Sequence, residues 1–286
     1  MTIQIVTDSS VRFLNPDNNH HDLINLVPTT VRFNEEAVED RPDLQLSDVR
    51  SRFEAEPGKV YADPPSVEQL VEVYSQLQAK TDEIVSIHTS SGINSSFRNA
   101  IKASEEFRGR CDIQVIDSTS LSAGLGMLAS SAAASATAGK SLEEIVRVVR
   151  GIIPRLYIVF FLDDLSYLER NGLVSRSQAI LGNMLNVLPF LTIEHGRLIP
   201  MEKVRTRLRA QEKLIEFVTE FSDIEQLGIL HSSPKPNDEA LLVAERLEAL
   251  YPATPIEYVN YGLATATYIG LNGLGLVVLE NAGEAL

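Results

Sequence analysis

The sequence predicts an α/β protein with two α/β domains, and two observations carry this prediction. Short β-rich runs alternate with helical patterns along most of the chain, which is typical of a parallel sheet with helices on both faces. The pattern then restarts near Gly151–Pro154 with the apolar run RLYIVFFLDD. We therefore predict a first domain over residues 1–150, with a mainly parallel sheet. The second is a smaller mixed-sheet α/β domain over residues 151–286.

The elements expected in the first domain follow one another along the chain. IQIVTDSS begins with a strand at Ile3–Thr7, and LINLVPTTVRF is a second extended run. SDVRSRFEA and SVEQLVEVYSQLQAK are expected helices with Ser47 and Ser66 as N-caps, because a serine oxygen accepts from the free N–H groups there. DEIVSIHT and CDIQVID are strands, each followed by a helix, and Ser141 caps the helix SLEEIVRVVRGI.

The second half alternates less regularly. RLYIVFFLDD is an apolar strand, LSYLER and RSQAILGNML are short helices, and VLPFLTIEHGRLIP is two strands joined at His195–Gly196. A long helix RTRLRAQEKLIEFVTEF, a strand IEQLGILHSS, a helix KPNDEALLVAERLEALY and a strand GLVVLE complete the pattern. The uncharged stretch Asn260–Leu279 is long enough to span a bilayer. Its glycines, asparagines and threonines favour a loop followed by a buried strand, so we expect no stable membrane insertion.

Composition limits the classes of function. The chain has 286 residues, of which 44% are apolar and 22% charged, as in soluble globular proteins. Its formal net charge of -14 argues against broad binding of nucleic acid or anionic membranes, because both need a basic surface. With a single cysteine, Cys111, and no N-terminal secretory signal, we expect a cytoplasmic protein.

Hydroxyl-rich turns recur at the ends of the expected strands. They are Thr7–Ser10, His88–Gly92, Ile116–Ser120 and His231–Ser233. Because the carboxyl ends of parallel strands lie along one edge of a sheet, where ligands bind, the three turns of the first domain are expected to converge. Hydroxyls and free amides at helix N-termini suit a carboxylate or a phosphate. The alternative is that each turn is a cap, since Ser, Thr and Asp are preferred capping residues.

A catalytic role for these serines has less support. A serine nucleophile needs a base within hydrogen-bond reach, and the G-x-S-x-G elbow is absent. By strand alternation His88 faces the packing of the sheet, whereas His231 ends a strand and is the better site candidate. Nucleotide-binding glycine motifs are absent, and no residues have the spacing of metal ligands. We therefore expect no catalytic residue, no metal and no cofactor.

Motifs in both halves of the chain resemble the DegV family. The N-terminal TDSS, the SSxxxSxF pattern at Ser90–Phe97 and IDS before a small-residue helix are similar to family motifs. The second half of the chain is similar to three consecutive family motifs, L-x-Y-L-x-x-G-G-R-[IV]-S, G-x-x-L and G-x-[IL]-x-P-x-x-K-x-R. The matching segment is LSYLERNGLVSRSQAILGNMLNVLPFLTIEHGRLIPMEKVRTRLRA. The resemblance covers nearly the whole chain.

The resemblance implies that the chain binds a long-chain fatty acid without catalysis of its own. Some family members present this ligand to a separate ATP-binding subunit of a fatty acid kinase. The Ser90–Ser96 turn would hold the carboxylate, and an apolar tunnel would hold the acyl chain. Small residues within Gly124–Gly139 would either leave room for the acyl chain or let backbones pack closely. The implied ligand-binding positions are Ala62, Asp63, Ser90, Ser91, Asn94, Ser95, Ser96, Ser118, His231 and Tyr268.

Four positions depart from the family pattern. Near the expected carboxylate, Ala62 stands for a threonine, Asn94 for a serine and Tyr268 for a histidine. Leu173 stands for the arginine of G-G-R, with Arg176 close in sequence. Asparagine and tyrosine can still donate hydrogen bonds, whereas alanine cannot. Whether the kinase partner is used is therefore left open, as are the length and saturation of the ligand and the oligomeric state.

A basic run is conspicuous in this acidic chain, and it consists of Lys203, Arg205, Arg207, Arg209 and Lys213. The positions expected to dock a partner or an acyl-phosphate head group are Arg176, Lys203, Arg205 and Arg207. The alternative is a solvated helix face. For the whole protein, the alternatives to fatty-acid binding are a serine-dependent hydrolase that uses the 90–96 turn and a binder of another amphipathic carboxylate.

Overall fold

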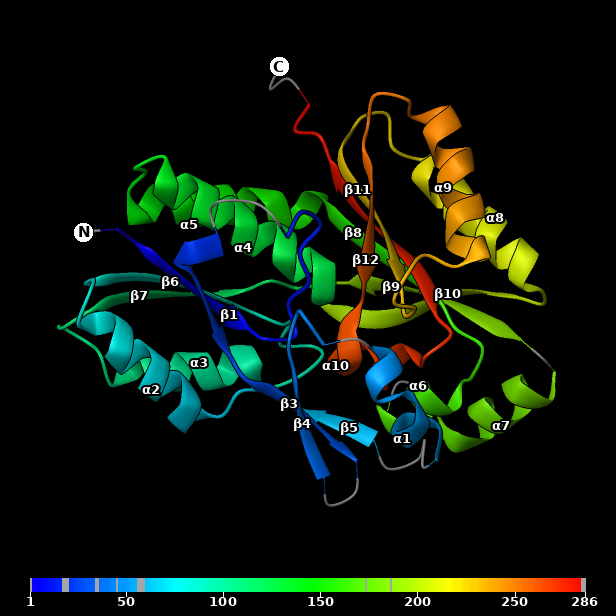
Figure 1. Ribbon diagram of the computed structural model, residues 1–286, viewed down its shortest axis with the longest axis horizontal. Coiled ribbons are helices and arrows are strands. Elements are labelled where there is room, and N and C mark those ends of the chain that lie inside the picture. The colour runs from blue at the N-terminus through cyan, green and yellow to red at the C-terminus, as the bar shows by residue number, and fades with distance from the viewer. Residues whose placement is uncertain are drawn as a thin grey trace.

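The computed structural model describes residues 2–16, 21–33, 36–44, 46–55, 60–172, 174–185 and 187–283 (Figure 1). Of His21 and Leu181 it describes only the backbone. The described strands form three sheets, of four, six and three strands. The two larger sheets lie side by side, with α4 (Ser122–Thr137) between them (Figure 1).

The first half of the chain folds around the four-stranded sheet, which is parallel throughout. Its strands lie in the order β2 (Ile24–Val27), β1 (Gln4–Asp8), β6 (Glu83–His88) and β7 (Asp112–Asp117). Helices α2 (Val67–Gln78) and α3 (Ser96–Glu105) cover one face, and α4 and α5 (Leu142–Ile152) cover the other (Figure 1). The expected parallel sheet with helices on both faces is confirmed.

Two of the three expected serine caps are confirmed. Ser66 and Ser141 each accept from the backbone N–H three residues on, and a Gln or Glu side chain returns the bond to complete a capping box. Ser47 instead lies inside a short 3-10 turn, Leu46–Asp48, which precedes α1 (Arg50–Ala55).

A three-stranded antiparallel sheet was not expected. It runs in the order β4 (Glu36–Asp40), β3 (Thr29–Phe33) and β5 (Val60–Asp63). The extended run that we treated as one strand is divided at Pro28, so that β2 joins the parallel sheet and β3 joins the small one. Proline has no N–H to donate to a ladder, which makes it a natural point of separation.

The second half folds around the six-stranded mixed sheet. The strand order is β10 (Arg197–Val204), β9 (Leu188–Glu194), β8 (Leu156–Phe161), β13 (Leu274–Glu280), β11 (Ile224–His231) and β12 (Ile256–Asn260). Helices α8 (Arg207–Val218) and α9 (Asp238–Leu250) cover its outer face, and short helices α6 (Ser166–Arg170) and α7 (Arg176–Met184) follow β8. The mixed sheet is confirmed, but it has more strands than the first sheet. The boundary near residue 150 stays a prediction.

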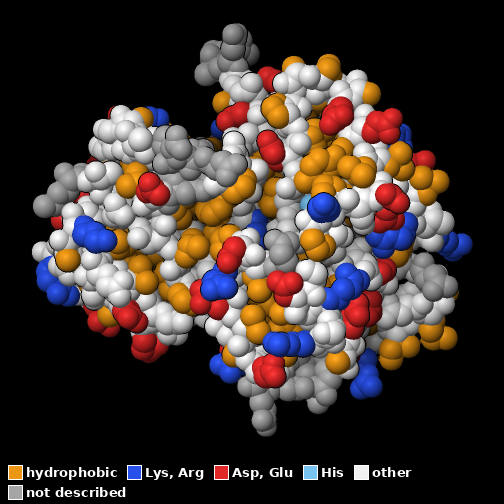
Figure 2. Space-filling view, in the orientation of Figure 1, with side chains coloured by type: hydrophobic (Ala, Val, Ile, Leu, Met, Phe, Trp, Pro, Cys, Tyr) orange, Lys and Arg blue, Asp and Glu red, His pale blue; other side chains and the backbone are white. Residues whose placement is uncertain are grey.

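The stretch 260–279 contains a helix that we did not expect, α10 (Gly262–Ile269), followed by the expected buried strand β13. No helix in the described ranges is long and apolar enough to cross a bilayer. On the face shown in Figure 2, acidic and basic side chains are interspersed rather than segregated.

The largest apolar cluster lies between the two large sheets. It combines Ile5 and Val85 of the parallel sheet, Leu128 of α4, and Ile158 and Phe160 of β8. The alternate residues of the mixed sheet face a second cluster under α8 and α9. The sheet therefore has an inner face, toward the first half of the molecule, and an outer face.

The small residues of α4 serve close packing at two positions. A Cβ at Gly126 would lie 1.8 Å from the Arg12 carbonyl oxygen, and a Cβ at Gly124 would lie 2.1 Å from Ser120 Oγ. Contacts this close are impossible for a side chain, so both glycines let neighbouring segments approach the helix. Of the two roles that we considered, the structure supports packing at these two positions.

Candidate functional site

Asn94 and Tyr268, which are far apart in the sequence, meet in space. Asn94 lies in the turn between β6 and α3, Tyr268 lies on α10, and their side chains are close enough for Asn94 to influence the pKa of Tyr268. Asn94 Oδ1 accepts from Ser96 N at 2.9 Å, so the amide nitrogen is left to donate. An asparagine amide and a tyrosine hydroxyl can each donate a hydrogen bond to a ligand.

This pair of donors is neutral and borders the apolar interior. Burial raises the pKa of Tyr268 to about 12, against the opposing effect of Asn94, so the phenol is protonated at pH 7. Ala62, Ile93 and Tyr268 all pack against the apolar cluster between the sheets. The arrangement can donate hydrogen bonds to an anion whose remainder is apolar.

Ser90 has a different role from the one we assigned to it. It is fully buried, and its hydroxyl donates to the Gly196 carbonyl oxygen at 2.7 Å, in the turn between β9 and β10. A Cβ on Gly92 would lie 2.5 Å from that same oxygen, so the two turns are in close contact. Ser90 therefore joins the two halves of the molecule, and its hydroxyl proton is not available to a ligand.

The other predicted serines divide into two kinds. Ser118 is buried and closes its own turn, because its hydroxyl donates to Ser120 O and accepts from Ser120 N, both at 3.0 Å. Ser95 Oγ accepts from Asn99 at 3.3 Å. Ser91 is partly exposed, and its backbone N–H is bonded to the Asp117 carboxylate at 3.2 Å. Ser96 Oγ is buried with no hydrogen-bond partner among the described residues. Ser91 and Ser96 thus remain candidates, whereas Ser118 does not.

His231 and Asp63 have partners other than the Asn94–Tyr268 pair. On β11, Leu230 faces the cluster between the sheets and Ile229 faces the outer cluster, so alternation places His231 on the outer face. The His231 ring accordingly packs against that of Tyr258, with centroids 6.4 Å apart. Asp63 pairs with Arg32 on the exposed surface of the small sheet. Our assignment of these two residues to the head-group site is therefore corrected.

A serine, a histidine and an aspartate do form a hydrogen-bonded chain, at a place that we did not predict. Ser86 Oγ lies 2.7 Å from His88 Nε2, and His88 Nδ1 lies 2.6 Å from Asp8 Oδ1. Tyr74 OH lies 2.7 Å from Ser86 Oγ, and all four side chains are fully buried. We call these four residues the Asp8–His88 chain. The alternation of Ser86 and His88 on one face of β6 was the available signal.

The charge of Asp8 is stabilised within this chain. Burial by itself raises the pKa of Asp8, but the attraction of His88 and hydrogen bonds from His88 and Thr89 outweigh it and lower the pKa. Thr89 N donates to Asp8 Oδ2 at 2.8 Å. No substrate reaches a group with zero exposure, so the chain orders the start of the 90–96 turn and offers no nucleophile.

The predicted docking residues are divided between surface and structure. Arg176, Lys203 and Arg205 are exposed. Arg205 borders an open hollow of about 610 Å³ that is also lined by residues of α6, α7 and the start of α8. Arg207 instead holds α8 to α9 through bonds of 2.6 and 2.5 Å to the Glu239 carboxylate, and it lies over the Phe161 ring. Arg207 is therefore a structural residue in this arrangement, and Leu173 falls outside the described residues.

Comparison with known proteins agrees with this architecture. The model of the DegV family, described as an uncharacterised protein family, matches residues 2–281. The chain belongs to the DegV family. Its members include Protein DegV of Bacillus subtilis, which is 28% identical over 280 residues, covering 96% of this chain and 98% of the relative. A DegV domain-containing protein of Clostridium acetobutylicum is 30% identical over 282 residues, covering 96% and 97%.

Solved structures of DegV proteins have the same fold. The crystal structure of Bacillus subtilis DegV, described as a fatty acid binding protein, superposes with a TM-score of 0.84 at 27% identity, over 98% of this chain and all of the other. The Streptococcus pneumoniae Fatty Acid Kinase (Fak) B3 protein, crystallised with linoleic acid, superposes with a TM-score of 0.85. At 18% identity, over 98% and 100% of the two chains, that second likeness shows the fold alone.

Proposed function

We propose that this protein binds a long-chain fatty acid and does not change it chemically. The observation that carries the proposal is the contact between Asn94 and Tyr268, two neutral donors at the border of the largest apolar cluster. A site of this kind suits a ligand with one anionic end and a long apolar body. The description of the Bacillus subtilis relative as a fatty acid binding protein supports the same ligand class.

The head group would be held by hydrogen bonds without a cationic partner. The carboxylate accepts from the Tyr268 hydroxyl and from the Asn94 amide, and it lies near the N-terminus of α3, whose dipole favours a negative charge. Each hydrogen bond to a charged group contributes about 1.5–3 kcal/mol. An acyl chain of roughly fourteen methylenes contributes on the order of 10 kcal/mol before ordering costs. The acyl chain thus dominates the affinity, and the two donors orient the ligand.

The absence of catalysis is supported by the state of the candidate groups. The Asp8–His88 chain is sealed in the core, and Ser90 and Ser118 donate their hydroxyl protons to backbone carbonyls. Among the described residues, no hydrogen bond joins a histidine to a serine of the 90–96 turn. A serine-dependent hydrolase needs such a bond, so that alternative has lost its support.

We further propose that the bound fatty acid is presented to a separate kinase subunit. The exposed residues Arg176, Lys203 and Arg205 are the surface that an acidic partner would contact. The fold shared with the Streptococcus pneumoniae protein is consistent with such a role. The test reverses the charges of Lys203 and Arg205 together and measures both docking to the kinase subunit and fatty-acid affinity. Weaker docking at unchanged fatty-acid affinity separates the two roles.

The lipid content of the purified protein tests the main proposal. Protein from a bacterial host, denatured and extracted, should release roughly one equivalent of fatty acid of about 14–18 carbons, enough methylenes for tight binding. Mass spectrometry identifies the ligand, and the double variant Asn94→Ala, Tyr268→Phe is the matched control with less retained lipid. Protein that releases no fatty acid and does not take up added palmitate would refute fatty-acid binding.

A further inference from the structure

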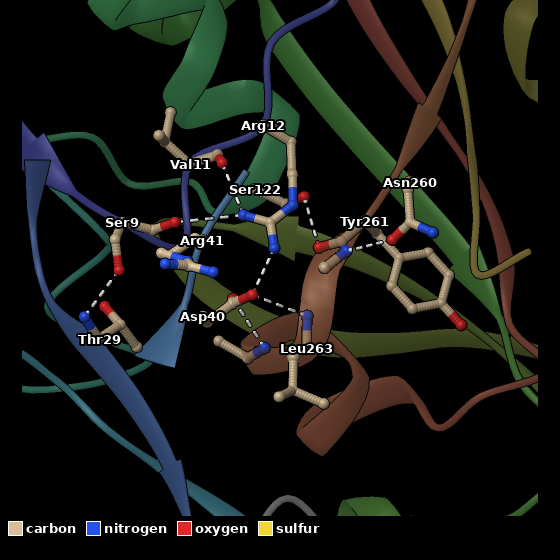
Figure 3. A network of polar contacts seen from close by, with 12 residues as sticks. Ser9, Val11, Arg12, Thr29, Asp40, Arg41, Ser122, Asn260, Tyr261 and Leu263 are labelled. Carbon is tan, nitrogen blue, oxygen red and sulfur yellow. Dashed lines mark hydrogen bonds and ion pairs between the residues drawn. The ribbon is translucent and has the colours of Figure 1, made fainter. Parts of the chain in front are cut away.

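The N-terminus of α10, the helix that carries Tyr268, is held by a buried carboxylate (Figure 3). Asp40, at the end of β4, accepts from Leu263 N at 3.1 Å and from Ala264 N at 2.9 Å. Its exposed fraction is zero. The first turn of a helix leaves its N–H groups without internal acceptors, and Asp40 supplies two acceptors from another segment.

Arg12 pairs with Asp40 and ties the helix to the first half of the chain. The guanidinium is ion-paired with Asp40, and it also donates to Ser9 O at 3.2 Å and to Val11 O at 2.7 Å. The Arg12 backbone N–H donates to Ser122 O at 3.2 Å, and the Ser122 hydroxyl donates to Tyr261 O at 2.9 Å. The loop after β1, the start of α4 and the start of α10 are therefore joined around one cation (Figure 3).

The Arg12 guanidinium packs directly against the start of α10. A Cβ at Gly262 would lie 2.2 Å from Arg12 Nη2, and Gly262 has a φ of +82°, which disfavours any other residue. At the other end of α10, Asn171 Nδ2 donates to the carbonyl of Thr267, next to Tyr268, at 3.0 Å. The helix is thus attached at both ends by side chains from distant segments.

We propose that Arg12 and Asp40 are positioning residues for the head-group site, because they hold α10 where the Tyr268 phenol meets Asn94. Tyr268 lies six residues beyond Gly262, roughly 9 Å along a helix. A tilt of about 10° at the start of α10 would move the phenol by roughly 1.6 Å, which is enough to break a hydrogen bond. The inference rests on the proposed function for its binding consequence, but the geometry of Tyr268 can be measured without a ligand.

Asp40→Asn is the informative variant, because asparagine still caps a helix but leaves Arg12 without its counter-charge. Fatty-acid affinity, measured by displacement of a fluorescent fatty acid, should fall about three- to tenfold in Asp40→Asn, and by no more than in Tyr268→Phe. In a Tyr268→Phe background the same change should cost less than about twofold, because residues acting through one group are not additive. Equal losses in the two backgrounds, or no loss in the parent, would overturn the proposal.

Two further measurements separate positioning from a general loss of structure. Asp43 lies three residues after Asp40 and forms an exposed ion pair with Arg41. Asp43→Asn breaks this pair and should leave fatty-acid affinity unchanged. Circular dichroism establishes whether each variant is folded. If Asp40→Asn is not folded, the affinity of Arg12→Lys is measured instead, in the parent and in the Tyr268→Phe background.

The ligand-free readout is the Cζ signal of Tyr268 in protein labelled with ¹³C-tyrosine, assigned by its loss in Tyr268→Phe. In Asp40→Asn this signal should move toward that of an exposed tyrosine, and an unchanged signal would overturn the positioning role. If the parent protein binds no fatty acid, the proposed function fails, while the Tyr268 signal still decides the positioning role.

Discussion

One polar cluster includes residues of β6 and another includes a residue of the turn after it, and the two differ in whether their hydrogen bonds are complete. In the Asp8–His88 chain, Asp8, His88, Ser86 and Tyr74 follow one another at hydrogen-bond distances of 2.6 to 2.7 Å. Each of these buried polar groups therefore has a partner within the chain. In contrast, the Asn94–Tyr268 pair offers an amide and a hydroxyl that can donate to a ligand.

The difference shows that residue type alone is a poor guide to the site. Serine, histidine and aspartate are the types associated with catalysis, yet here they are mutually saturated and fully buried. Asparagine and tyrosine, which departed from the family pattern, keep donors at the border of the apolar interior. A ligand is expected where donors are left over, since an unpaired buried donor is costly.

The largest effect is expected from removing the Asp8 carboxylate from the Asp8–His88 chain. Asp8→Ala should lower the free energy of unfolding by about 3–5 kcal/mol, because it leaves His88 and the Thr89 N–H without their buried partner. Urea denaturation at pH 7 measures it. A loss below about 1 kcal/mol would show that the chain is not saturated as described.

The Asp8–His88 chain also determines how the free energy of unfolding changes at low pH. The pKa of Asp8 is lower in the folded protein than its ordinary value of 3.8, so the unfolded state binds the proton first as pH falls. Its contribution is complete above that value and is lost as pH falls through the folded pKa. Asp8→Asn should therefore flatten the loss of stability below about pH 4, and a parallel loss in both proteins would contradict this.

The next largest effect is expected from removing the Asn94 amide of the Asn94–Tyr268 pair. Asn94→Ala should weaken fatty-acid binding by about one to two powers of ten, because it deletes a donor and frees the Ser96 N–H. Its effect on unfolding should be smaller than that of Asp8→Ala. Displacement of a fluorescent fatty acid measures the affinity, and an unchanged value would place the head group elsewhere.

A smaller effect is expected from Tyr268→Phe. The ring still packs against the apolar cluster, and only the hydroxyl is lost, so affinity should fall by about three- to tenfold. Because the pKa of Tyr268 is about 12, parental binding should show no transition from this group between pH 6.5 and 8.5. A titration in that range which disappears in Tyr268→Phe would show that the phenol ionises more easily than its burial implies.

The smallest effect on binding is expected at His231, which lies outside the proposed head-group site. His231→Gln should leave affinity within about twofold, since residues without shared partners act independently. Burial lowers the pKa of His231, opposed by the Ser233 backbone, so the unfolded state binds the proton first as pH falls below about 6.5. His231→Gln should reduce that loss of stability, and a loss of affinity instead would return His231 to the site.

Several elements could be predicted because their signal is local. Ser66 and Ser141 cap their helices through bonds to residues three positions away, so the sequence contains the whole interaction. The alternation of strands and amphipathic helices predicted the parallel sheet for the same reason. Helix α10 was missed because nearly every residue from Gly262 to Ile269 is buried, which leaves no polar face to reveal a helical period.

The sequence by itself determined the class of fold, most of its elements, and the residue types available at the site, including the changes at Ala62, Asn94 and Tyr268. The tertiary structure decided which of these residues keep a free donor. Ser90 donates to a carbonyl 106 positions away, and Arg12 pairs with a carboxylate 28 positions away. Hydrogen-bond partners at such separations are set by how the sheets pack against each other, and no local pattern in the chain records them.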